Sequence, residues 1–108
     1  MNKTDTKKEY EHLKSLFKDV DESKLSLVDE LLKQTAFLTV ELKEMSKTIS
    51  KEGPLQYSNK GNVRESQTYK TYLKSLAIYQ GIIKTLNSIA GKNVIDEDDE
   101  FDEFIKNH

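Results

Sequence analysis

The sequence predicts an all-α protein in which a short N-terminal helix precedes a long antiparallel helical hairpin. Apolar residues recur every three or four positions over two long stretches, which is the spacing of one face of a helix. The 108 residues include four glycines and one proline, and such low counts favour long helices over a β fold rich in turns. Because this length suits one domain, a second hydrophobic core is not expected.

Cysteine usage and hydropathy exclude several classes of protein. The chain has no cysteine, which excludes a disulfide scaffold, a thiol nucleophile and a thiolate zinc site. No apolar run approaches the roughly 18 residues that span a bilayer, and residues 1–8 are too polar to begin a signal peptide. We therefore expect a soluble cytoplasmic protein with no membrane partner.

The first helix is expected over Lys7–Lys18, where Tyr10, Leu13, Leu16 and Phe17 fall on one face. An acidic turn follows it. In this turn Asp21 or Ser23 is expected to cap the next helix, because a short polar side chain can accept a hydrogen bond from an unpaired backbone N–H.

The second helix is expected over Lys24–Lys51, a stretch without glycine or proline. At 1.5 Å per residue it is about 40 Å long. Ala36, Phe37 and Val40 fall opposite its main apolar stripe, and a helix that is apolar on all sides is buried on all sides. Either the first helix or another subunit is expected to cover this second face.

A glycine-proline pair ends the second helix, and Leu55–Glu65 is expected to form a loop rich in polar residues. The last helix is expected over Gln67–Ala90, with Ser66 as its cap and Gly91 after its end. Its apolar residues alternate spacings of three and four, which is typical of a coiled-coil seam that packs on the second helix, on a neighbouring subunit or on both. The seam comprises Tyr69, Tyr72, Leu76, Tyr79, Ile83, Leu86 and Ala90.

Charge divides the chain into two parts. Residues 94–108 hold seven of the 19 acidic residues and one of the 17 basic residues, which leaves residues 1–93 with a net charge of +4. We therefore expect a helical DNA-binding and oligomerisation domain over residues 1–93 and a flexible acidic tail over residues 94–108. Among the acids, Phe101, Phe104 and Ile105 have the spacing of a segment that folds as a helix into a partner's groove. A solvated tail, or one folded back on the basic body, is the alternative.

The chain lacks the residue sets that catalysis requires. His12 and His108 have no partner at metal-ligand spacing, and the acids Asp96–Glu100 lack the central glycine of a calcium loop. There is no phosphate-binding glycine-rich loop and no nucleophile motif. We therefore expect no enzymatic activity, no cofactor and no metal.

Exposed cations are the remaining candidates for function, because they can neutralise DNA phosphates without reading bases. In a single subunit, solvated surface lysines are the alternative interpretation, but a ring multiplies each weak contact by the number of subunits. The candidate DNA-binding residues are Lys7, Lys8, Lys14, Lys18, Lys60 and Arg64.

The order of segments resembles the short small-terminase subunits of tailed bacteriophages and related prophages of Gram-positive bacteria. The similarity covers most of the chain from Tyr10 to Ala90 and is based on common residue types. The acidic tail departs from it, because many such proteins end soon after the last helix. The segments that carry the resemblance are Tyr10–Asp21, Lys24–Asp29, Ala36–Leu38, Tyr57–Gly61, Tyr69–Tyr72 and Ile83–Leu86.

This resemblance implies a non-enzymatic DNA-packaging factor in the cytoplasm of the bacterial host. Small terminase subunits form homo-oligomeric rings, bind double-stranded viral DNA and regulate the ATPase and nuclease of the large terminase subunit. The tail residues Phe101, Phe104 and Ile105 would then dock the large subunit. A helical adaptor that binds only a protein partner, through its acidic tail, is the alternative. The expected packing and interface residues are Phe37, Val40, Tyr69, Tyr72, Leu76 and Tyr79.

Overall fold

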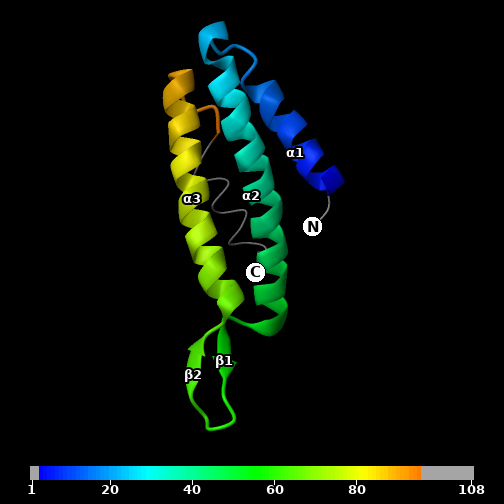
Figure 1. The fold of residues 1–108 in the computed structure, drawn as a ribbon, viewed down its shortest axis with the longest axis vertical. Coiled ribbons are helices and arrows are strands. Elements are labelled where there is room, and N and C mark those ends of the chain that lie inside the picture. Colours follow the sequence, from blue (N-terminus) through cyan, green and yellow to red (C-terminus); the bar gives the residue numbers. More distant parts are fainter. Residues whose placement is uncertain (1–2, 96–108) are drawn as a thin grey trace.

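The computed structural model describes residues 3–95, which form three helices and one β-hairpin (Figure 1). Both α1 and α3 pack on α2, which lies between them. The body is elongated, with extents of 59 × 26 × 22 Å, and the hairpin projects from one end of its long axis. In chain order the elements are α1 (Lys3–Leu16), a single 3-10 turn (Glu22–Lys24), α2 (Leu25–Glu52), β1 (Leu55–Tyr57), β2 (Val63–Glu65) and α3 (Gln67–Ala90).

Local chemistry sets the C-terminal ends of both long helices and the start of α3, as predicted. The Ser66 side chain accepts a hydrogen bond from the backbone N–H of Tyr69 at 3.0 Å, which caps α3. Gly91 ends α3 with a φ of 73°, and Gly53 follows α2 with a φ of 84°. Positive φ values favour glycine because it has no Cβ atom to clash with the backbone.

The predicted cap of the second helix was wrong. Asp21 makes no side-chain cap hydrogen bond, and Ser23 lies inside the 3-10 turn. The backbone closes this turn instead, through a 2.8 Å hydrogen bond from the N–H of Lys24 to the carbonyl of Asp21. The first helix also begins and ends earlier than predicted, at Lys3 and Leu16. The apolar periodicity could not locate its first turn, which is polar.

The predicted loop at Leu55–Glu65 was also wrong, because this segment forms an antiparallel β-hairpin with Leu55 opposite Glu65. A hydrogen bond of 2.8 Å from the N–H of Ser58 to the carbonyl of Asn62 continues the pairing into the turn. Gly61, with a φ of 81°, allows the chain to reverse there. Each strand has only three residues, too few for an alternating pattern to be recognised.

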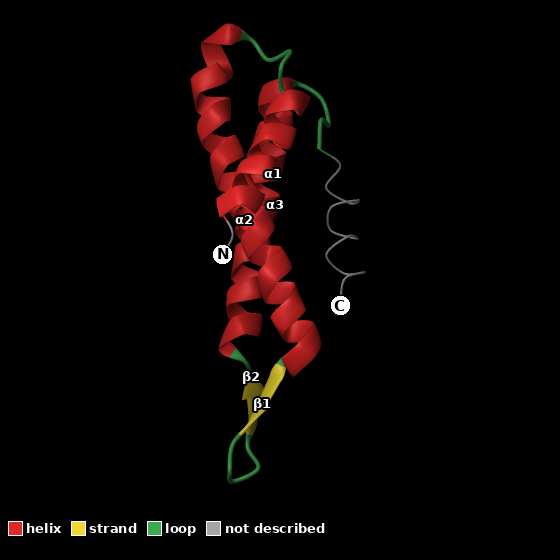
Figure 2. Cartoon of the chain, turned by 90° about the vertical axis from the view of Figure 1, so that its right-hand side faces the viewer, coloured by secondary structure: helices red, strands yellow, loops and turns green. Residues whose placement is uncertain are grey.

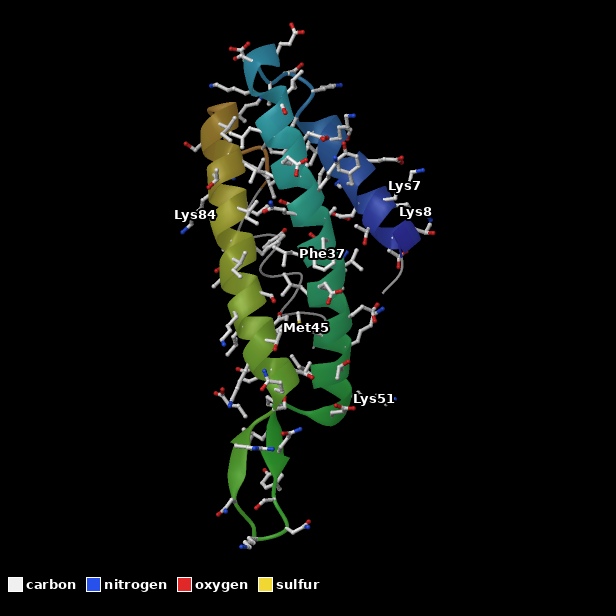
Figure 3. The ribbon with its side chains drawn as sticks, in the orientation of Figure 1. Lys7, Lys8, Phe37, Met45, Lys51 and Lys84 are labelled. Atoms are coloured by element: carbon white, nitrogen blue, oxygen red, sulfur yellow. The ribbon has the colours of Figure 1, made fainter. Side chains whose placement is uncertain are left out.

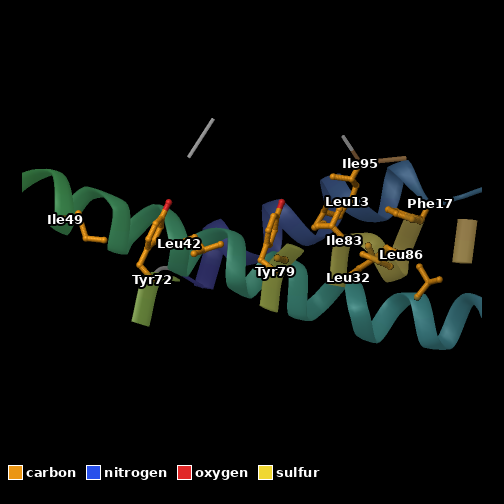
Figure 4. Close-up of a cluster of buried hydrophobic side chains, with 12 residues drawn as sticks. Leu13, Phe17, Leu32, Leu42, Ile49, Tyr72, Tyr79, Ile83, Leu86 and Ile95 are labelled. Carbon is orange, nitrogen blue, oxygen red and sulfur yellow. The ribbon is translucent and has the colours of Figure 1, made fainter. Parts of the chain in front are cut away.

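The core lies mainly between α2 and α3, and Leu13 of α1 and Phe17, just after α1, add to it at one end (Figure 4). Thr35 and Thr39 are buried on α2, where their hydroxyls donate to backbone carbonyls of the same helix at 2.8 Å. These bonds satisfy the polar groups that the packing removes from water. The largest fully buried side chains are Leu32, Leu42, Ile83, Leu86, Thr35 and Ser46.

The second apolar face of α2 is covered in part by α1. Ala36 and Val40 are buried, and a hollow between the two helices is lined by Lys8 of α1 and Val40 of α2. Phe37, by contrast, remains 46% exposed. One helix of this chain therefore covers two of the three residues that the sequence placed on this face.

The packed body extends two residues beyond the predicted boundary at residue 93. Ile95 is buried against the core, and the side chain of Asn87 forms two hydrogen bonds with its backbone. Asn87 Nδ2 donates to the Ile95 carbonyl at 2.9 Å, and the Ile95 N–H donates to Asn87 Oδ1 at 3.0 Å. The tail residues predicted to bind a partner, Phe101, Phe104 and Ile105, lie outside the described residues.

A polar cluster links α1 to α2. The Tyr10 hydroxyl donates a hydrogen bond to Asp29, and Lys33 Nζ lies 3.3 Å from the other carboxylate oxygen. Both contacts hold the pKa of Asp29 below its ordinary value, and the tyrosine hydrogen bond is the larger cause.

Replacing Tyr10 with phenylalanine is therefore expected to raise the pKa of Asp29 toward its ordinary value of 3.8. A lowered carboxyl pKa stabilises the fold above that ordinary value and stops doing so as pH falls through the lowered pKa. The variant should thus lose stability relative to the parent at neutral pH, and the difference should shrink in acid. An NMR titration of the Asp29 carboxyl measures the shift, and an unchanged pKa would contradict the assignment.

Candidate functional site

The hairpin end, defined as residues 47–74, is the part of the body with a net positive charge. It comprises the end of α2, the β-hairpin and the first two turns of α3. Its acidic residues are Glu52 and Glu65, and its basic residues are Lys47, Lys51, Lys60, Arg64, Lys70 and Lys74.

The net positive charge of residues 1–93 lies entirely at this end. Outside it, residues 1–46 and 75–93 contain ten basic and ten acidic residues. The hairpin end therefore carries the whole excess of +4. Figure 3 shows Lys51 at the end of α2 that joins the hairpin, and Lys7 and Lys8 on α1. A local excess of positive charge attracts polyanions.

The cations of the hairpin end are accessible. All six are exposed. Lys47 lies 3.6 Å from Glu44, a contact between exposed side chains, while the other five take part in no ion pair within residues 3–95. Exposed cations without a protein partner remain free to bind anions in solution.

The predicted DNA-binding residues fall into two groups. Lys60 and Arg64 are exposed on the hairpin, whereas the other four belong to α1 and the turn after it. Lys8 shares its hollow with three acidic residues, and Lys14 Nζ lies 5.8 Å from the centre of the Tyr10 ring. The α1 group comprises Lys7, Lys8, Lys14 and Lys18.

Sequence reasoning missed Lys51, Lys70 and Lys74, which the fold brings to the same end as Lys60 and Arg64. A signal was present, because Gln67–Ala90 contains three lysines and no acidic residue. The predicted antiparallel helical hairpin also implied that the end of the second helix and the start of the last helix flank the connection between them.

The predicted interface residues differ in how deeply they are buried. Val40, Tyr72 and Tyr79 are buried inside the chain, and burial raises the pKa of the Tyr72 hydroxyl. Tyr69 and Leu76 are half-buried against the core. Phe37 is the predicted interface residue with substantial exposure, and the fold leaves other large apolar side chains of α2 and α3 uncovered. These uncovered apolar residues are Leu25, Leu27, Phe37, Leu73 and Ile78.

Comparison of the chain with family models, with curated proteins and with solved structures finds no match. In the part of the chain that the structure describes, no group of three or more histidine, cysteine, aspartate or glutamate side chains is arranged to hold a metal ion. Within residues 3–95, no helix combines the length and apolar character required to cross a bilayer.

Proposed function

We propose that the protein is a small terminase subunit, a DNA-packaging factor that assembles into a ring, binds double-stranded viral DNA and regulates the large terminase subunit. The single observation that carries this proposal is the +4 excess at the hairpin end. The resemblance of the chain to small terminase subunits supplies the biological setting. The proposed role is non-enzymatic, without cofactor or metal.

The charge distribution supports binding to a DNA backbone. Lysine and arginine side chains that neutralise phosphates release condensed counterions, so affinity falls steeply as salt rises. A ring would present one hairpin end per subunit, and contacts that are weak singly would act together.

The uncovered apolar residues support self-association. Phe37 is 46% exposed and Ile78 is 58% exposed, and each lies on one of the two long helices that pack against each other. Exposed apolar surface on a monomer is commonly a protein contact site. A second copy of the chain, meeting these residues, would remove them from water.

Duplex DNA binding by two matched triple variants tests the proposal. Replacing Lys51, Lys70 and Lys74 with glutamine is expected to weaken binding about tenfold or more at moderate salt and to reduce the salt dependence. The control replaces Lys7, Lys8 and Lys14 with glutamine, which removes the same charge from α1, and it should bind within about twofold of the parent. Fluorescence anisotropy with a labelled long duplex measures both, and a larger loss in the control would place the DNA contact on α1.

A second candidate function is a helical adaptor that binds a protein through its acidic tail. The seven acidic residues of residues 94–108 favour it. It predicts no DNA binding at low salt, either by the intact chain or by a chain ending at Ile95. The same anisotropy measurement therefore separates the two candidates.

A further inference from the structure

The β-hairpin has one face formed by polar side chains. Gln56 lies directly opposite Arg64 in the strand register, and Ser58 is hydrogen-bonded to Asn62 two residues further along. Cross-strand partners share a face, and residues two apart on a strand return to it. These four residues, together with Tyr57, line one shallow hollow of about 620 Å³.

The opposite face carries apolar side chains that nothing in the described chain covers. Leu55, Tyr57 and Val63 are exposed, and Tyr57 is 70% exposed. The hairpin extends beyond the helices along the long axis in both views (Figures 1 and 2). An isolated two-stranded ribbon is at best marginally stable in water, so its projection from the body indicates an element that meets a partner.

We infer that this hairpin enters the major groove of duplex DNA as a two-stranded ribbon, with Gln56 and Arg64 reading the edges of adjacent base pairs. The inference deepens the proposed function and rests on it, because the cations of the hairpin end hold the duplex whose bases the ribbon reads. The major groove, about 12 Å wide, admits a two-stranded ribbon.

The chemistry of the polar face fits base reading. An arginine guanidinium donates two hydrogen bonds to O6 and N7 of guanine, and a glutamine amide both donates to and accepts from adenine. Because Gln56 and Arg64 are cross-strand partners, their side chains leave the ribbon side by side. Lys51, Lys70 and Lys74 lie on the helices that flank its base, where lysines would contact phosphates and fix the register of the ribbon without carrying sequence information.

The test selects binding sites from a pool of duplexes with a randomised centre. The full-length parent is expected to enrich a site that contains guanine. The double variant Gln56→Ala, Arg64→Ala should lose about tenfold of the preference that the parent shows for the enriched site over the unselected pool. Both substituted residues are exposed, so the variant should keep the fold of the parent. Circular dichroism checks that it does. The matched control replaces Lys51, Lys70 and Lys74 with glutamine and should weaken binding to all sequences alike without changing the enriched site.

A modified base tests directly whether the contact with guanine lies in the major groove. Replacing the contacted guanine with 7-deazaguanine removes the N7 acceptor, which lies in the major groove. Binding by the parent should weaken, while binding by Arg64→Ala should change little. Enrichment of the same site by parent and double variant would overturn the inference, as would a parent that binds the pool but enriches no site. Either result leaves the proposed function standing, whereas failure to bind any duplex would remove both.

Discussion

A protein carrying Phe37→Glu is expected to be a monomer under conditions in which the parent is a multimer. The Phe37 ring is half exposed near the middle of α2, on the side that α1 leaves open (Figure 3). If a second copy covers this ring, glutamate would place an unpaired carboxylate in the contact, which is strongly unfavourable. Loss of such an anchor costs about 2 kcal/mol or more at each interface, and a closed ring repeats that cost around the assembly.

Light scattering coupled to size exclusion gives the mass of each variant. Ser50→Glu is the matched control, because Ser50 is also exposed on α2, lies more than three turns from Phe37 and gains the same charge. It should keep the mass of the parent. A multimeric Phe37→Glu protein would exclude Phe37 from the interface, and a monomeric parent at high concentration would favour the adaptor.

Two truncations that differ by two residues are expected to differ sharply in stability. A chain ending at Ile95 should keep the free energy of unfolding of the parent. A chain ending at Asn93 should lose about 3 kcal/mol, because it removes the buried Ile95 side chain and leaves the Asn87 amide buried without its two hydrogen bonds. A loss of this size is a large fraction of the 5–15 kcal/mol that stabilises a typical domain.

Urea unfolding measures this difference, and equal midpoints for the two truncations would contradict the role of the Asn87–Ile95 contact.

The chain ending at Ile95 is also the appropriate one for testing the tail. It should retain the oligomer but stimulate the ATPase of the large terminase subunit less than the parent does. Unchanged stimulation would remove Phe101, Phe104 and Ile105 from this role.

The elements that could be predicted from the sequence are those set by neighbouring residues. The N-terminal cap at Ser66 and the glycine ends at Gly53 and Gly91 depend on hydrogen bonds and backbone angles within a few positions. The long helices likewise follow from periodic apolar residues. The predicted cap at Asp21 also concerned neighbouring residues, but it was wrong. A backbone hydrogen bond within the 3-10 turn competes with the Asp21 side chain.

The candidate site lies in one contiguous stretch, residues 47–74, and the sequence identified only part of it. Lys60 and Arg64 were identified as cations in a polar stretch, but their cross-strand neighbours depend on pairing between two three-residue strands. Lys51 and Lys70 were missed, although the predicted antiparallel helical hairpin placed the end of the second helix and the start of the last helix beside that stretch. What the sequence could not supply is the strand register that sets Gln56 opposite Arg64.

The sequence by itself therefore determined the mostly helical class, the C-terminal ends of both long helices, the start of α3 and the net charge of the body, since each follows from local hydrogen bonding or composition. Tertiary structure decided which apolar face is covered, burying Val40 while leaving Phe37 exposed. It also decided the register of the β-hairpin and that Ile95 belongs to the core. The physical reason is that burial and strand pairing depend on contacts between separate segments of the chain, which no local pattern specifies.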